Sequence, residues 1–194
     1  MTNETTNMTA RADRRASKSR DEILDAAQRI VERDGAGNLT IDGVAREAGF
    51  SKGGVLYNFP NKECLLKGML NRMLQNKMPQ LDAYREEFAG GPHPTLRAII
   101  KTTANKECLD PALSRAILAV AAEDPDMLAP LHAELARRWE QVREECADRD
   151  MAALLWAAAD GLMYHALMDI GIFPPEKRAE LLQKLDELAA TACK

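Results

Sequence analysis

The chain has 194 residues and a net charge of −4, and 46% of its residues are hydrophobic while only 5% are aromatic. This length permits one large domain or two smaller ones with a buried core, and the many strong helix formers favour helices. No apolar run approaches the ~20 residues that cross a bilayer, and the polar N-terminus lacks the apolar segment of a secretory signal. We therefore expect a cytoplasmic protein that makes no use of a membrane.

The cysteines and histidines show no grouping that would suggest a metal site. The four cysteines form no CxxC pair, and the three histidines are not clustered with them. This favours reduced, partly buried thiols, although a thiol sensor stays open as an alternative. We expect neither a metal site nor a cofactor.

Positive charge is concentrated near the N-terminus. Residues 1–62 hold 10 Lys/Arg against 9 Asp/Glu, whereas the remainder holds 16 against 21. Five basic side chains between residues 11 and 20 face only Asp13. Residues 1–18 are polar and lack apolar periodicity, so we predict a disordered basic arm. Such an arm either keeps the protein soluble or contacts an anionic polymer such as DNA.

Four helices are predicted in the next part of the chain. The first begins near Ser19, which has capping-box spacing to Glu22, and its apolar residues fall at helical spacing through Val31. Glycines follow it and end it. The N-caps of the second, third and fourth predicted helices are, in order, Thr40, Ser51 and Asn61.

The second and third predicted helices have the pattern of a helix-turn-helix. Ala45 supplies a small side chain where two helices cross closely, and Gly49 tolerates positive φ in the turn. Val55 supplies an apolar contact on the second helix of the motif. Phe59, just after this helix, is expected to fill the core.

Beyond residue 80 the sequence predicts one helix after another. Glycines and prolines interrupt the chain between residues 90 and 94, and Pro111 and Pro125 each begin a new helix. No segment shows the alternation of a strand. The expected helices span 95–106, 111–124, 126–147, 151–170 and 176–191.

The first 62 or so positions resemble the DNA-binding domain of the TetR/AcrR family of transcriptional regulators. The matching residues are Leu39-Thr40-Ile41, the run VAREAGFSKG at 44–53, Tyr57-Asn58-Phe59 and the run NKECLL at 61–66. The resemblance implies an all-α fold of about nine helices, with a three-helix helix-turn-helix domain at 19–64 and an effector-binding and dimerisation domain at 65–194. It also implies a ligand-responsive homodimer, most simply a repressor that a small-molecule effector releases from a palindromic double-stranded DNA operator.

The resemblance places the third helix in the major groove, where Lys52 would reach a guanine edge or a phosphate. Leu56 stands where the family most often has Tyr, so the aromatic phosphate contact falls on Tyr57. Asp42 and Glu47 would repel phosphate, so we expect them to point away or to form internal pairs. The candidate DNA-binding residues are Thr40, Ser51, Lys52, Gly53, Gly54, Tyr57, Asn58 and Lys62.

The resemblance also implies an effector cavity among the helices between residues 95 and 170. Methionines and aromatic residues suit such a cavity, although each also fits ordinary core packing. The candidates are Met127, Leu131, Leu135, Trp139, Trp156, Tyr164, His165 and Met168. Asp160 is expected to be exposed; if it were buried, it would need a partner or could meet a cationic ligand. The last two predicted helices, 151–170 and 176–191, would pair with their copies in the dimer.

Two other classes of protein stay open on the residues alone. An enzyme could use His132 with Glu134, or His165 with Asp169, but only the second pair shares a helix face. The chain has no GxSxG, HExxH or phosphate-loop motif to support it. A helical partner-binding module that has lost DNA binding would explain the departures from the family pattern in the third helix. We expect a regulator and not an enzyme.

Overall fold

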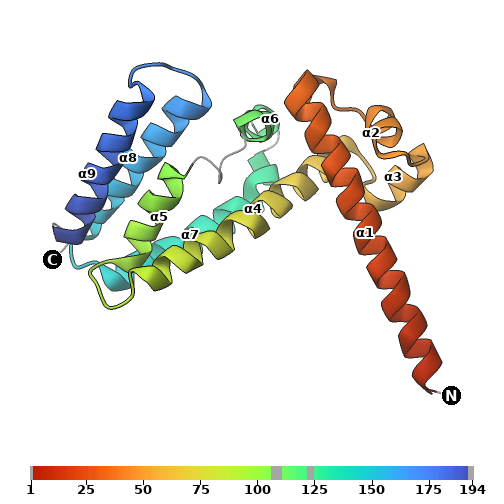
Figure 1. Ribbon diagram of the computed structural model, residues 1–194, viewed down its shortest axis with the longest axis horizontal. Coiled ribbons are helices and arrows are strands. Elements are labelled where there is room, and N and C mark those ends of the chain that lie inside the picture. The colour runs from red at the N-terminus through yellow and green to blue at the C-terminus, as the bar shows by residue number, and fades with distance from the viewer. Residues whose placement is uncertain (1, 106–110, 122–124, 192–194) are drawn as a thin grey trace. The chain divides into compact units, whose positions relative to one another are not determined.

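The structure is a computed structural model that describes residues 2–105, 111–121 and 125–191, and the side chains of these residues except 2–17, 36, 119 and 120. All regular elements in these ranges are helical, which confirms the all-α prediction (Figure 1). In chain order they are α1 (Thr2–Asp34), the 3-10 helix η1 (Ala36–Asn38), α2 (Ile41–Ala48), α3 (Lys52–Asn58), α4 (Lys62–Glu87), α5 (Pro94–Ala104), α6 (Pro111–Ala121), the 3-10 helix η3 (Pro125–Leu128), α7 (Ala129–Glu145), α8 (Arg149–Leu167) and α9 (Pro175–Thr191).

Two compact units make up the chain, Met1–Leu70 and Asn71–Lys194. Their boundary falls inside α4, so this helix belongs to both units, whereas the sequence analysis expects a boundary after residue 64. The physical reason is that the first turns of α4 still contribute buried side chains to the first unit: Leu65, Leu66, Met69 and Leu70.

The start of α1 differs from the expectation for this segment. The helix begins at Thr2, where the sequence analysis predicts a disordered arm followed by a cap at Ser19. Once a helix has formed further along, each residue added to its end gains a backbone hydrogen bond without a new nucleus. Several alanines and arginines precede Ser19, and both residue types have high helix propensity. Polarity and charge therefore do not exclude a helix here.

The first unit is built on the C-terminal half of α1, which packs on α2, while α2 packs on α3. The buried face of α1 has the predicted helical spacing: Ile23, Ala26, Ala27, Ile30 and Val31. Phe59, directly after α3, is only 1% exposed, which confirms its predicted place in the core. This core fixes the positions of α2 and α3, which together form the helix-turn-helix.

In the second unit a cluster of buried apolar side chains lies where α5 packs against α7, α8 and α9, and α8 packs against α9 (Figure 1). Arg97 of α5 donates to both carboxylate oxygens of Asp186 on α9, at 2.8 and 3.0 Å. The core residues include Leu81, Leu96, Ile99, Ile100, Val142, Ala152, Leu155, Ala159, Leu162 and Leu182.

Polar side chains fix the position of α7 against α4 and α5. Arg138 of α7 is 1% exposed, and it donates to Asp82 of α4 at 2.5 Å and to Glu134 at 2.7 Å. Glu145, the last residue of α7, accepts from both the backbone N–H and the hydroxyl of Thr95, each at 2.7 Å. A buried guanidinium is stable only with such partners, so these contacts specify how the helices meet.

Several helix ends differ from their predictions. The helix predicted at 126–147 is divided into η3 and α7, because Pro130 in the first turn of α7 starts a new helix. The side chain of Asp148 accepts from the backbone N–H of Met151 and caps α8, which ends at Leu167 instead of residue 170. Predicted helical residues 106 and 122–124 lie outside the described residues. No described helix has both the length and the apolar character needed to cross a membrane.

Candidate functional site

The backbone from α2 to α3 forms the predicted helix-turn-helix. Thr40 and Ser51 each accept a hydrogen bond from the backbone N–H three residues on, at 3.0 and 3.1 Å, so both N-caps are confirmed. Gly49 ends α2 with a φ of 71°, in the left-handed region where glycine is favoured. Ala45 and Val55, the apolar positions of the pattern, are both buried.

Two long side chains of α3, those of Lys52 and Tyr57, are open to solvent. Tyr57 is 86% exposed, so it is not a core aromatic residue. A Cβ added at Gly53 would meet only the Ser51 hydroxyl, at 4.0 Å, which leaves the backbone there uncovered. At Gly54 a Cβ would lie 3.3 Å from the same hydroxyl. The surface of the first turn of α3 is therefore formed largely by backbone.

Lys52, the first residue of α3, forms an ion pair with Asp42 of α2 at 3.0 Å between Nζ and Oδ2. Both side chains are well exposed, and exposed pairs of this kind contribute only about 0–1 kcal/mol. Lys52 can therefore exchange Asp42 for another anion at little cost. Without another anion, the Lys52 ammonium stays next to the Asp42 carboxylate, between α2 and α3.

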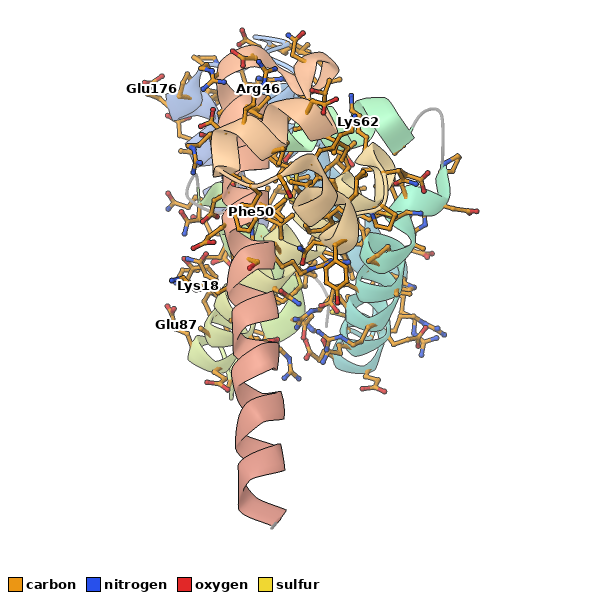
Figure 2. All side chains as sticks on the ribbon, turned by 90° about the vertical axis from the view of Figure 1, so that its right-hand side faces the viewer. Lys18, Arg46, Phe50, Lys62, Glu87 and Glu176 are labelled. Atoms are coloured by element: carbon orange, nitrogen blue, oxygen red, sulfur yellow. The ribbon has the colours of Figure 1, made fainter. Side chains whose placement is uncertain are left out.

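The remaining candidates of this surface are less open than the sequence analysis expects. Asn58 donates its side-chain amide to the backbone oxygen of Gly54 at 3.0 Å, which leaves one N–H of that amide for another partner. Lys62 is half-buried, and so is Leu56, which is not one of the candidates. In Figure 2, the labelled Arg46 on α2 and Lys62 at the start of α4 locate this region.

Glu47 forms the internal pairs that the sequence analysis expects for it. Its carboxylate accepts from Arg29 at 2.9 Å and from Arg33 at 3.2 Å, both on α1. These hydrogen bonds hold the pKa of Glu47 below its usual value, and the one from Arg29 has the largest effect. The negative charge of Glu47 is thus neutralised by α1, whereas that of Asp42 is neutralised by Lys52 of α3.

Two residues that support α3 escape the sequence analysis. Arg20 lies over the Phe59 ring, with Cζ 4.3 Å from the ring centroid, and donates to the backbone oxygen of Asn58 at the end of α3. Gly68 of α4 faces the same ring: a Cβ there would lie 2.6 Å from Cε1 of Phe59. Neither contact follows from helical spacing, because each joins residues from different helices.

Three of the eight candidate effector residues meet in one groove between α7 and α8. Leu135, Trp139 and Trp156 line it together with Ala136, Ala153, Ala157 and Asp160, and its volume is about 430 Å³. The two indole rings lie 6.2 Å apart between centroids and are tilted by 59°. This groove, called here the α7–α8 groove, is a candidate ligand site.

The other five candidates do not line the α7–α8 groove. Met127 is fully buried, while Tyr164 and Met168 are exposed. Leu131 is half-buried. His165 packs near Phe173, with 5.9 Å between ring centroids. Helical periodicity identifies apolar faces correctly here, but it does not identify which faces meet.

Asp160 is half-buried in the α7–α8 groove, which corrects the expectation that it is exposed. Burial removes water from its carboxylate and raises its pKa above the usual value. The positive charge of Lys77 on α4 and a hydrogen bond with Trp156 act in the opposite direction but only partly offset this effect. Asp160 is therefore a carboxylate with less stabilisation than it has in water.

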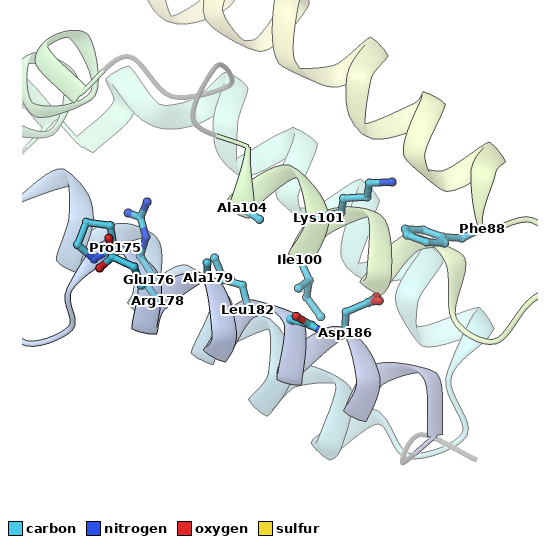
Figure 3. Close-up of a pocket in the computed structure, with 11 residues that line it drawn as sticks. Phe88, Ile100, Lys101, Ala104, Pro175, Glu176, Arg178, Ala179, Leu182 and Asp186 are labelled. Atoms are coloured by element: carbon cyan, nitrogen blue, oxygen red, sulfur yellow. The ribbon is translucent and has the colours of Figure 1, made fainter.

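A second cavity, also of about 430 Å³, lies between α5 and α9 (Figure 3). Its lining includes Ile100, Ala179 and Leu182, with Lys101 and Arg178 among the charged residues around them. Lys101 pairs with Glu87 at 2.6 Å. The sequence analysis does not predict this cavity. Among the described residues, no group of three or more His, Cys, Asp or Glu side chains is arranged to hold a metal ion.

A capped helix-turn-helix followed by an all-helical unit with ligand-sized cavities defines the class of helical DNA-binding regulators. Residues 94–190 match the family described as tetracyclin repressor-like, C-terminal domain, and residues 23–69 match the bacterial regulatory proteins of the tetR family. The chain belongs to the TetR family of transcriptional regulators. Members of this family are DNA-binding regulators and not enzymes, so the enzyme alternative is dropped.

Individual relatives agree with this family membership. The chain is 34% identical over 89 residues to the HTH-type transcriptional regulator RutR of Escherichia coli K12, a match covering 46% of this chain and 42% of that protein. A putative regulator from Streptomyces coelicolor A3(2) shares the fold with a TM-score of 0.69 at 21% identity, over 90% of this chain and 99% of that one. A putative regulator from Saccharomonospora viridis, solved in complex with choline, shares the fold with a TM-score of 0.69 at 19% identity. This match covers 88% of this chain and 96% of that one.

Proposed function

We propose that this protein is a homodimeric repressor that leaves a palindromic DNA operator when a small-molecule effector binds. The observation that carries DNA binding is the open surface of α3, where Lys52 at its start and Tyr57 near its end are exposed and Gly53 leaves the backbone uncovered. Such a surface suits the major groove, where a lysine reads guanine edges and a hydroxyl contacts phosphate.

The proposed contacts with the operator come from the N-terminal basic segment, the helix-turn-helix and the start of α4. Thr40 and Ser51 use their hydroxyl oxygens as N-cap acceptors, which leaves their O–H donors for phosphate. Lys52 and Tyr57 supply the long side chains, and residues 1–18 supply a basic arm. The proposed set is Thr40, Ser51, Lys52, Gly53, Gly54, Tyr57, Asn58 and Lys62.

A dimer through α8 and α9 is supported by the apolar surface that these helices leave exposed. Leu154 and Tyr164 of α8, Met168 directly after this helix and Leu188 of α9 are large apolar side chains open to solvent. Exposed apolar side chains that gather on one surface mark protein–protein interaction sites. Two copies are also needed for two recognition helices to meet successive major grooves, ~34–36 Å apart.

The test measures binding of the protein to DNA fragments flanking its own gene, by fluorescence anisotropy over a range of salt concentrations. Lys52→Ala should weaken specific binding by about 1–3 kcal/mol, and Tyr57→Phe by about 1 kcal/mol through one lost hydrogen bond. Arg143→Ala is the matched control, because Arg143 is a basic residue of α7, outside both proposed interfaces, that pairs with Glu140. Binding without sequence preference, or unchanged affinity in the Lys52 and Tyr57 variants, would contradict the proposal.

A further inference from the structure

The α7–α8 groove contains both tryptophans of the chain and a single carboxylate. Trp139 and Trp156 line it with Asp160, while the remaining lining residues are one leucine and three alanines. Alanines leave open space beside the two large rings, and the volume of about 430 Å³ lies in the range of about 300–1,000 Å³ typical of small-molecule sites.

Charge in this groove is one-sided. Asp160 is its only charged lining residue, and burial deprives this carboxylate of water, so its pKa is raised. The faces of the tryptophan rings are themselves attractive to cations because of the negative charge of their π-systems. A carboxylate beside two indole rings thus makes the whole groove favourable to positive charge.

We infer that the α7–α8 groove binds a small organic cation, with Asp160 as its counter-ion and Trp139 and Trp156 against its apolar body. The inference rests on the effector response proposed above and gives that effector a chemical class. An anion would be repelled by Asp160, and a neutral ligand of the same shape would cover this carboxylate without neutralising it.

Lys77 gives the bound cation a link to α4. Its positive charge attracts Asp160 across from α4 to α8. A cation in the groove offers Asp160 a second positive partner and so competes with Lys77. Binding would therefore weaken an attraction that involves α4, the helix that also belongs to the first unit.

Intrinsic tryptophan fluorescence tests the inference directly, because the chain has 2 tryptophans and both line the groove. The probes are phenyltrimethylammonium, its uncharged isostere tert-butylbenzene, and benzenesulfonate as the anion. We expect a saturable change with the cation, binding at least about tenfold weaker for the isostere, equivalent to about 1.4 kcal/mol, and no binding of the anion. Equal affinity for cation and isostere, or no saturable change, would overturn the inference.

Variants separate the role of Asp160 from a general effect on folding. Asp160→Asn keeps the size of the side chain and removes a poorly solvated charge, so the protein should remain at least as resistant to urea as the wild type. It should bind the cation about tenfold more weakly and the isostere unchanged. Lys77→Gln should bind the cation several-fold more tightly, because the competing charge is gone. Asp169→Asn is the matched control. Asp169 lies outside the groove, and its backbone is in the left-handed region, which asparagine tolerates.

Five further outcomes are decisive. Unchanged cation affinity in Asp160→Asn would overturn the inference, as would weaker binding in Lys77→Gln. A fluorescence change that follows protein concentration instead of the cation would mean that a second copy covers the groove. The DNA-binding measurement is made without any ligand. If the protein binds its operator but does not bind the cation, only the inference about the α7–α8 groove is rejected, and the proposed DNA binding stands. Cation binding without release of DNA rejects the proposed release and leaves the ligand class standing.

Discussion

Gly68 lies well inside α4, where the ring of Phe59 packs directly against the helix backbone. A Cβ at this position would lie 2.6 Å from Cε1 of Phe59 and 3.2 Å from a methyl carbon of Leu24. The guanidinium of Arg20 lies over the same ring, with Cζ 4.3 Å from its centroid. A glycine inside a helix normally costs about 0.5–1 kcal/mol relative to alanine, so here it is retained for the space that it leaves to the ring.

Replacing Gly68 by alanine should therefore destabilise the protein despite the better helix propensity of alanine. We expect a loss of about 1–3 kcal/mol in the free energy of unfolding, as for other overpacked cores, measured by urea denaturation. Gly53→Ala is the matched control in the same unit, because a Cβ there meets nothing closer than 4.0 Å. Equal or greater resistance of Gly68→Ala to urea would show that the Phe59 ring has room to move.

At the scale of elements, α3 is a helix of 7 residues that depends on its two ends. Its paired glycines cost about 2 kcal/mol relative to alanines, and so short a helix is not stable alone. Ser51 accepts from the N-terminal backbone, while Phe59 N–H donates to Val55 at 2.8 Å and Arg20 donates to the Asn58 oxygen at 3.3 Å. These contacts stabilise a sequence with weak intrinsic helicity.

Removing the N-cap should loosen α3 in particular. We expect Ser51→Ala to cost about 0.5–2 kcal/mol and to accelerate amide hydrogen exchange in α3 more than in α2. Ser51→Asn is the control, because asparagine also accepts from the backbone at an N-cap position. Exchange in α3 that is the same for Ser51→Ala and the wild type would mean that packing, and not the cap, holds this helix.

The elements also show which features a sequence predicts. Thr40, Gly49, Ser51 and Asn61 act on backbone groups within a few residues, and the structure confirms all three N-caps and the left-handed turn. The burial of Asp160 depends on how α7 and α8 meet, so periodicity misplaces it. For the same reason only three of the eight predicted effector residues share the α7–α8 groove.

At the scale of the whole molecule, an apolar surface of α8 is exposed in the single chain. Leu154 is 66% exposed, and Tyr164 and Met168 are also open to solvent. Gly161 lies on the same helix, and a Cβ there would meet nothing within 4 Å. Small residues beside exposed large ones allow another helix to approach closely, which is the physical basis of the proposed dimer.

A charge placed on this surface should separate the dimer. We expect Leu154→Glu to sediment as a monomer in analytical ultracentrifugation, because a buried carboxylate without a partner is costly. Its affinity for an operator fragment should fall as well, since a monomer presents one recognition helix. Ala133→Glu, at an exposed alanine of α7, is the matched control. A dimer that persists in Leu154→Glu would place the interface elsewhere.

The continuity of α4 restricts how this chain can be cut or altered. A fragment that ends at Leu70, the last residue of the first unit, would leave the final four carbonyl groups of the shortened helix without their partners. Those turns carry Leu66 and Met69, which are buried. Fraying of the shortened helix would therefore remove buried side chains from the core of the isolated fragment. An insertion or deletion of one residue in α4 would rotate all that follows by about 100° and shift it by about 1.5 Å. A chimera that joins parts of two family members within α4 therefore has to keep the number of residues in this helix unchanged.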